Sequence, residues 1–475
     1  MRWIGAVLLL VLLGCERPAA PEATRPNIVF ILIDDLGWAD LPAYGHAFHE
    51  TPHIDRMVAE GMRFTDAYAA TPVCSPTRAS IQSGQYPARI GMTDFIPGHW
   101  RPYERVTVPI NRTQHLPAET ITIGEAMQSA GYTTGYFGKW HLGGAPEHQP
   151  TAQGYDHALV HAGWGQYDLA RKLIPRAPDI DPNAYLVDVL TDSTTAFIAE
   201  HADAEQPFFV TLAHFAVHIP LEADSAKIAK YTQKPKPDDK VNNPIYAAMI
   251  EHVDESVGAV LDALDAHGLA ETTVVVLYSD NGGLVERFDQ ADGVIVSTNE
   301  PLRNEKGSLY EGGIRVPFIA RWPGQIAAGR TEPALMTSPD LFPTFVDLAE
   351  GALPETQPLD GISLVPYLTG QEVTEEDQTI FFHYPHYHHA NPAGVVRRGR
   401  YKLLHDYAED RLELYDLRND IGETTNLADS LGYLVDELNT ALEAWRAEVG
   451  AEMPTLNPDF DATRRGEWGR HPSRR

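Results

Sequence analysis

Residues 27–35 have the sequence Asn-Ile-Val-Phe-Ile-Leu-Ile-Asp-Asp, an unbroken apolar run closed by two carboxylates. A run so rich in large and β-branched apolar residues is typical of a strand covered on both faces of a sheet. Similar runs follow at residues 208–213 and 272–278. Between these two, residues 246–264 carry apolar side chains at helical spacing. Buried strands that alternate with amphipathic helices predict an α/β fold with a large, mainly parallel sheet flanked by helices.

The composition of the chain changes toward the C-terminus, where acidic residues cluster at 372–377. Residues 401–404 and 412–417 have the pattern of paired antiparallel strands, and residues 431–449 have the pattern of a helix. We therefore predict three parts in this order: a large domain at 27–370, a smaller α+β subdomain with an antiparallel sheet at 371–455, and a loosely ordered tail at 456–475.

The N-terminus has the pattern of an export signal. Arg2 precedes an apolar run over residues 4–13, which is too short to cross a bilayer, and Gly14 and Cys15 follow. This ending resembles the lipobox of bacterial lipoproteins, which implies a signal peptide over residues 1–15, a lipid on Cys15 and a tether over residues 16–26. An ordinary signal peptide with an incidental cysteine is the alternative. We expect export to the cell envelope of a bacterium, either lipid-anchored to the outer membrane or periplasmic.

The charge balance limits the class of partner. The chain has 66 Asp and Glu against 37 Lys and Arg, a formal net charge of −29. Nucleic-acid binding needs a basic footprint, so we expect no nucleic-acid partner. If the substrate is an anion, its site must be a local positive pocket within an acidic exterior.

Two acidic clusters fall at the ends of predicted strands. Asp34 and Asp35 close the first strand, and Asp280 and Asn281 follow the strand at 272–278. Ligands of open α/β sheets bind beyond the carboxyl ends of the strands. Three carboxylates and one amide oxygen suit calcium or magnesium better than zinc. One Asp–Asp pair alone would be explained by turn formation or helix capping.

Cys74 is one of only two cysteines, which are too few for a disulfide framework. Pro76 suits the first turn of a helix, and Gly84 suits its end. Cys74 is then expected near a helix N-terminus, where backbone N–H groups favour anions. A buried reduced thiol is the alternative, and it leaves Pro76 and Arg78 without an explanation.

These segments resemble the signatures of a known family. Residues 74–84, with Cys74-x-Pro76-x-Arg78, resemble the first signature of the type I sulfatases, and residues 131–143 resemble the second. Further matches lie at 27–35, 280–283 and 306–317. The resemblance implies an alkaline-phosphatase-like fold and a sulfuric ester hydrolase of the arylsulfatase type. It also implies that a formylglycine-generating or anaerobic sulfatase-maturating enzyme oxidises Cys74 to formylglycine (3-oxoalanine).

The resemblance assigns a role to each matching residue. Hydrated formylglycine would offer one hydroxyl to attack sulfur and a second to expel sulfate. Its partners fall into two groups. The ligands of one calcium ion, with magnesium less favoured, would be Asp34, Asp35, Asp280, Asn281 and the formylglycine at position 74. Arg78 would pair with the hydrated aldehyde, and Lys139 and Lys306 would neutralise sulfate oxygens. His141 would remove a proton during release, and His218 would donate a proton to the leaving oxygen.

The export signal favours a sulfated carbohydrate as substrate, because exported members of this family desulfate algal galactans, fucans or glycosaminoglycans. Two aromatic and basic segments, at 94–101 and 383–389, suit a carbohydrate subsite. For the second segment, a structured loop or an adventitious metal site is an equal alternative. The candidate substrate-binding residues are His99, Trp100, Arg101, His383 and His386.

Two other functions remain as alternatives. One is a phosphate or phosphonate ester hydrolase of the same superfamily, some members of which share the Cys-x-Pro-x-Arg element. The other is a lipoprotein that binds sulfated glycans without turnover. The second predicts an unmodified Cys74 or the loss of a catalytic residue, whereas every expected residue is present.

Overall fold

A computed structural model describes residues 25–237, 241–286, 295–371, 373 and 378–474. The predicted signal peptide with Cys15, most of the tether and nearly all of the acidic cluster at 372–377 lie outside the described residues. None of the helices in the described part of the chain is both long and apolar enough to cross a membrane.

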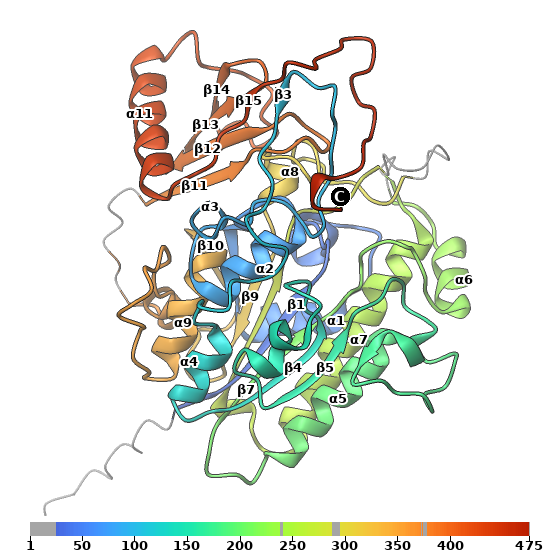
Figure 1. Ribbon diagram of the computed structural model, residues 1–475. Coiled ribbons are helices and arrows are strands. Elements are labelled where there is room, and N and C mark those ends of the chain that lie inside the picture. Colours follow the sequence, from blue (N-terminus) through green and yellow to red (C-terminus); the bar gives the residue numbers. More distant parts are fainter. Residues whose placement is uncertain (1–24, 238–240, 287–294, 372, 374–377, 475) are drawn as a thin grey trace, which may run out of the picture.

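The large sheet is mainly parallel, with β1 near its centre (Figure 1). β1 pairs in parallel with β7 on one side and β8 on the other, whereas β9 and β6 run antiparallel to their neighbours. The three strands predicted from apolar runs are confirmed, with β8 shifted by one residue. Within the described residues the order is β10 (Arg330–Thr337), β2 (Met62–Tyr68), β9 (Phe318–Arg321), β8 (Thr273–Ser279), β1 (Asn27–Ile33), β7 (Phe208–Ala213), β4 (Thr133–Lys139), β5 (His157–His161) and β6 (Leu173–Ile174).

Helices cover both faces of this sheet. Alternate side chains of β1 feed two cores, because successive residues of a strand face opposite sides. Ile28, Phe30 and Leu32 belong to one core, which also contains residues of α2, α4 and α9. The other core contains residues of α1, α5 and α7. The helix bounds are α1 (Pro52–Glu60), α2 (Cys74–Ser83), α4 (Ile123–Ser129), α5 (Leu186–Glu200), α7 (Pro244–Ala266) and α9 (Leu341–Leu348), with shorter or peripheral helices at α3 (Pro87–Ile90), α6 (Ser225–Gln233), α8 (Glu311–Ile314) and α10 (Val365–Thr369).

The C-terminal part contains the predicted antiparallel sheet and helix. Its four strands are paired in chain order, and α11 (Gly432–Glu448) packs against one face (Figure 1). The predicted pairing of residues 401–404 with 412–417 is confirmed by the register of the last two strands. The strands are β11 (Thr379–Tyr384), β12 (Ala393–Arg398), β13 (Tyr401–Asp406) and β14 (Arg411–Asp416).

A buried ion cluster joins this sheet to the large domain. The Nζ atom of Lys402, on β13, lies 2.8 Å from a carboxylate oxygen of Glu311 and 2.8 Å from one of Glu423. All three side chains are almost fully buried. Burial raises the pKa of Glu423 to about 7 although Lys402 opposes the shift. Lys402 therefore holds two carboxylates that would otherwise repel each other.

The residues predicted as a loose tail are packed against the rest of the protein. β15 (Thr455–Leu456) pairs with β3 (Val106–Thr107). Farther on, the ring centroid of Trp468 lies 4.7 Å from that of His99, and the Arg101 guanidinium carbon lies 4.2 Å from the Trp468 centroid. The prediction of a loose tail rested on its place at the end of the chain. In the structure most of its residues are exposed, but these aromatic contacts join it to the loop at 94–101.

Candidate active site

The carboxylates at the ends of β1 and β8 lie side by side because these strands pair in register, Ile33 opposite Ser279. Asp34 and Asp280 are completely buried, and Asp35 is 2% exposed. The backbone N–H of Asp35 donates to a carboxylate oxygen of Asp280 at 3.2 Å. The expected meeting of the two acidic clusters at one edge of the sheet is therefore what the structure shows.

Cys74 is the first residue of α2, which ends at Gly84 in a left-handed conformation (φ 68°). The Cys74 Sγ atom lies 3.3 Å from a carboxylate oxygen of Asp34 and 3.6 Å from the Nζ atom of Lys306. Burial and the charge of Asp34 raise the pKa of the Cys74 thiol well above its ordinary value. A thiol in this position stays protonated, and a protonated thiol is a poor nucleophile.

Three buried cations among the described residues pair with the three carboxylates. The Nε and Nη2 atoms of Arg78 both lie 2.8 Å from one oxygen of Asp280. Lys139 forms a short ion pair with Asp34. Lys306 donates to both oxygens of Asp35. This pocket is therefore locally balanced within a strongly acidic protein.

The pKa values of the carboxylates respond differently to these neighbours. Burial alone would raise the pKa of Asp34, but Lys139, His218 and Arg78 hold it well below its ordinary value. For Asp280, burial and the charge of Asp34 outweigh Arg78 and raise the pKa to about 7. Of these two carboxylates, Asp280 is therefore the more easily protonated.

The donor set fits a calcium ion. Asn281 donates its Nδ2–H to Asp35 at 2.7 Å and to the Gly282 carbonyl at 3.0 Å. Its buried Oδ1 atom has no hydrogen-bond partner among the described residues. An unpaired buried amide oxygen next to Asp34, Asp35 and Asp280 is a group that a hard cation would satisfy.

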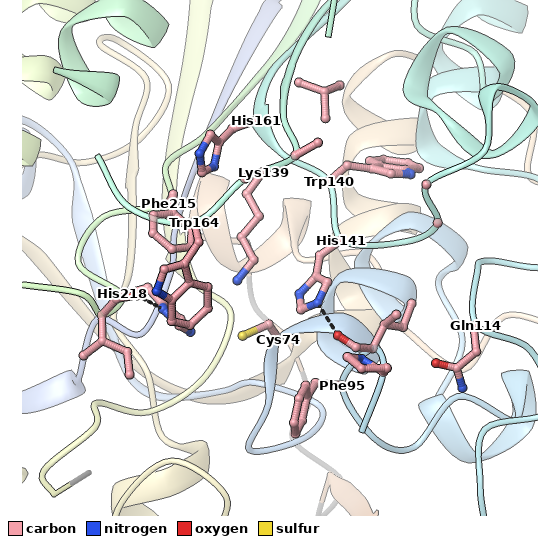
Figure 2. Close-up of a pocket in the computed structure, with 18 of the residues that line it drawn as sticks. Cys74, Phe95, Gln114, Lys139, Trp140, His141, His161, Trp164, Phe215 and His218 are labelled. Carbon is pink, nitrogen blue, oxygen red and sulfur yellow. Dashed lines mark hydrogen bonds between the residues drawn. The ribbon is translucent and has the colours of Figure 1, made fainter. Parts of the chain in front are cut away.

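Two histidines flank Cys74 from opposite sides (Figure 2). His141 makes a 2.8 Å hydrogen bond from Nε2 to the Ile96 carbonyl, and burial and Lys139 hold its pKa well below the ordinary value. His218 uses Nδ1 to reach the Ile219 carbonyl at 2.6 Å and places Nε2 3.6 Å from Asp35. Burial lowers the pKa of His218 to about 4.

Cys74, Lys139 and Lys306 open into a cavity of about 600 Å³. Figure 2 shows Lys139 pointing toward Cys74 at the base. His141, Phe95 and Gln114 lie on one side, and His161, Trp164, Phe215 and His218 lie on the other (Figure 2). His99 and His388, whose rings contact Phe95, also line the cavity. The cavity falls within the range of about 300–1,000 Å³ that is usual for small-ligand sites.

Of the predicted substrate-binding residues, His99 lines the cavity. Trp100 packs instead with Val106 and Val108. Arg101 donates to the His388 carbonyl at 3.1 Å, so its guanidinium is held among protein groups. The loop at 94–101 does reach the cavity, but through fewer of its side chains than predicted.

His383 and His386 do not line the cavity. The His383 ring nitrogens lie 2.9 Å from the Tyr407 hydroxyl and 3.0 Å from the Glu452 carbonyl. His386 makes a 2.8 Å hydrogen bond from Nε2 to Thr93. Both rings are 2% exposed, so their hydrogen bonds serve the packing of the C-terminal part. His388, from the same run, is the residue that reaches the cavity.

His161, Trp164 and Gln114 line the cavity although no motif of the sequence marks them. Phe95 also lines it and lies in the predicted segment at 94–101, but it was not among the candidate residues. His161 ends β5, so its position at the carboxyl end of a strand was the available clue. That strand is short and half-exposed, and its pattern did not predict it.

The comparisons with known proteins agree with this geometry. The family model described as Sulfatase matches residues 26–352. The chain belongs to the sulfatase family. It is therefore a sulfuric ester hydrolase, as predicted. A second model, described as N-sulphoglucosamine sulphohydrolase, C-terminal, matches residues 304–448 of this sulfatase.

Individual relatives cover most of this sulfatase. It is 30% identical to a "Sulfatase" of Formosa agariphila, over 92% of each chain. It is 34% identical to the N-acetylgalactosamine-6-sulfatase of Canis lupus familiaris, over 83% of this chain and 74% of the relative. The crystal structure of Ps i-CgsB in complex with k-i-k-neocarrahexaose matches with a TM-score of 0.77 and 27% identity, over 93% of this chain and 96% of that chain. The predicted alkaline-phosphatase-like fold is confirmed.

Proposed function

We propose that this sulfatase removes sulfate from a sulfated carbohydrate, with formylglycine formed from Cys74 and one calcium ion. The observation that carries the proposal is the position of Cys74 at the base of the cavity, with its Sγ atom 3.3 Å from Asp34 and 3.6 Å from Lys306. Burial and Asp34 raise the pKa of the thiol and make it a poor nucleophile, whereas its oxidised and hydrated form would supply a nucleophilic hydroxyl there.

The residues around position 74 suit the charge of a sulfate ester. Asp34, Asp35, Asp280 and Asn281 would hold the calcium ion, which when bound would polarise a sulfate oxygen as a Lewis acid. Lys139 and Lys306 approach Cys74 from the cavity side and would neutralise the other sulfate oxygens as charge moves. Arg78 would orient the nucleophile at the N-terminal end of α2.

The two histidines would move protons on opposite sides of the nucleophile. His218 is fixed through Nδ1 and directs Nε2 toward Asp35, whose charge favours a proton on that nitrogen. Once Nε2 is protonated, His218 would donate this proton to the leaving oxygen. His141 is fixed through Nε2, and its buried Nδ1 lacks a hydrogen-bond partner within the described ranges. That nitrogen can accept the proton released when sulfate departs.

A sugar is the leaving group that we favour. Two of the similar proteins are named for sulfated sugars or bind one: the N-acetylgalactosamine-6-sulfatase, and Ps i-CgsB with its neocarrahexaose. The cavity also offers more room than a sulfate group needs. We further propose export to the cell envelope through the signal peptide, anchoring through a lipid on Cys15, and conversion of Cys74 by a maturating enzyme.

The test is sulfate release from defined sulfated galactose and N-acetylgalactosamine oligosaccharides by enzyme co-produced with a maturating enzyme. Ion chromatography should detect sulfate from at least one of them, and Cys74→Ala should release none. Peptide mass spectrometry should find an aldehyde at position 74. Turnover of nitrophenyl sulfate alone would contradict the carbohydrate assignment, and faster turnover of nitrophenyl phosphate would favour the phosphate-ester alternative.

The proposed lipid anchor has its own test. Labelling with a radioactive fatty acid should be lost in Cys15→Ser.

A further inference from the structure

One wall of the cavity is built by the end of β5 and the loop that leads to β6. β4 and β5 pair in parallel with Lys139 opposite His161, so His161 lies at the same sheet edge as the anion-binding lysine. Trp164 follows three residues later in this loop. No signature motif of the family resemblance includes either residue.

His161 is a buried polar side chain that faces a cavity. It is 3% exposed, and neither ring nitrogen has a hydrogen-bond partner among the residues that the structure describes. Burial, together with Lys172 and Lys139, lowers the pKa of His161 to about 3, so the ring is neutral. A neutral imidazole has one donor and one acceptor, which matches a hydroxyl group. Because unpaired buried polar groups are costly, His161 is poised to bind a ligand.

Trp164 is an exposed aromatic residue at the mouth of the same cavity. Trp164 is 56% exposed and lines the cavity. Its ring centroid lies 5.1 Å from that of His218 and 5.8 Å from that of Phe215, both in near-perpendicular contacts (Figure 2). These contacts hold the indole in place while leaving a large apolar surface for a ligand to cover.

We propose that Trp164 and His161 form the subsite for the sugar ring that carries the sulfate. Trp164 stacks against the apolar C–H face of the ring, and His161 forms a hydrogen bond with one of its hydroxyls. This inference rests on the proposed function, in which His218 protonates the leaving oxygen. That transfer requires the oxygen to lie within about 3.2 Å of His218, which brings the attached ring against the neighbouring Trp164.

The pair suits a sugar better than a flat aromatic alcohol. A pyranose is apolar on its C–H faces and carries hydroxyls at its edges, as the Trp164 and His161 wall requires. An aryl group could cover Trp164 but would leave both nitrogens of His161 buried and unpaired. A site built to bind a hydroxyl discriminates strongly against a substrate that lacks it.

The experiment compares kcat/KM on a sulfated galactose oligosaccharide with that on 4-nitrophenyl sulfate. We expect His161→Ala to lower the sugar value about fivefold, chiefly through KM, and to lower the nitrophenyl value much less. We expect Trp164→Ala to lower the sugar value about tenfold, and Trp164→Phe to keep most of it. Tyr433→Ala removes an aromatic residue that is 73% exposed on α11, and it should change neither value.

The outcomes separate the two hypotheses. The subsite is wrong if wild-type enzyme desulfates the sugar and the variants leave the ratio of the two kcat/KM values unchanged. The proposed function itself, and the subsite with it, fails if wild-type enzyme desulfates no sugar. Inhibition by inorganic sulfate provides a control for the anion site, because its inhibition constant should be the same in all variants. A loss of sulfate affinity in His161→Ala would indicate a structural role instead.

Discussion

The Nζ atom of Lys306 lies 2.6 and 2.7 Å from the two carboxylate oxygens of Asp35. A calcium ion would need the same oxygens, so Lys306 would compete with the metal. We predict that Lys306→Met raises calcium affinity at least about tenfold, because it leaves Asp35 buried without its cation. Sulfate release should nevertheless fall by about 100-fold or more, because a stabilising charge is lost from the transition state.

Calorimetric titration with calcium and assays of sulfate release check this prediction. Lys306→Arg is the matched control, since it keeps the positive charge and should keep calcium affinity near that of the wild type. Weaker calcium binding in Lys306→Met would show that Lys306 supports the metal site rather than competing for it.

Calcium removal is predicted to affect stability as well as activity. A ligand that binds only the folded state stabilises it by about 2.7 kcal/mol at 100 times its Kd. Chelation should therefore lower the melting temperature and abolish sulfate release, and added calcium should restore both. Asp280→Asn should bind calcium more weakly and show a smaller rise in melting temperature. If the melting temperature of wild-type protein does not respond to calcium, the four oxygen ligands do not form the site.

His218 should matter most for substrates whose leaving group needs a proton. On a sulfated sugar, we predict that His218→Ala lowers kcat/KM by about 100-fold to 10,000-fold. On 4-nitrophenyl sulfate, whose leaving group departs as a stable anion, the loss should be less than about tenfold. Equal losses on both substrates would assign His218 to binding or to the metal site.

Asp340 should make stability depend on pH. Its buried carboxyl accepts backbone N–H groups of Thr337 and Ile362 at 2.7 and 2.8 Å, and burial raises its pKa from 3.8 to about 7. The folded state thus binds a proton that the unfolded state releases between about pH 4 and pH 7. Its contribution to stability is complete below the unfolded pKa and is lost as the pH rises through the folded pKa.

Urea unfolding of wild-type protein and Asp340→Asn at pH 5, 6, 7 and 8 measures this effect. As the pH rises toward 7, the free energy of unfolding of the wild type should fall relative to that of the variant by up to about 1.4 kcal/mol per pH unit. A constant difference between the two proteins would mean that Asp340 is ionised throughout.

Lys402 should be essential for stability. Lys402→Met leaves Glu423 buried without its ion-pair partner and leaves Glu311 with Arg315 alone, at 3.4 Å, and we expect a loss of about 3–5 kcal/mol in the free energy of unfolding. Lys230→Met is the control, because Lys230 makes a more exposed ion pair with Glu251 at 2.7 Å and should cost less than about 1 kcal/mol. Similar losses would show that Lys402 does not hold the buried cluster together.

The strands that could be predicted are those whose burial on both faces leaves a long apolar run, as in β1. β9 has only four residues and ends in Arg321, and its antiparallel direction depends on pairing with β2 and β8. Such pairing is a tertiary effect that local pattern does not encode.

The clustering of the candidate active-site residues could be predicted because they sit in signature motifs at strand and helix ends. The cavity walls could not, because they depend on which way isolated side chains face. His383 and His388 share one polar, aromatic run, yet His383 bonds to Tyr407 while His388 reaches the cavity. Composition cannot distinguish these orientations.

All ten residues of α2 are buried, and Cys74 contacts Lys306, which is added to the chain 232 residues later. An enzyme that oxidises Cys74 would have to bind the residues on either side of it while they are still exposed. Under the proposed function, oxidation of Cys74 would have to come before this segment is enclosed, so the order of events in the producing cell would matter. A molecule that folds before oxidation would be inactive. The specific activity of a preparation would then report the fraction of molecules that were oxidised before they folded.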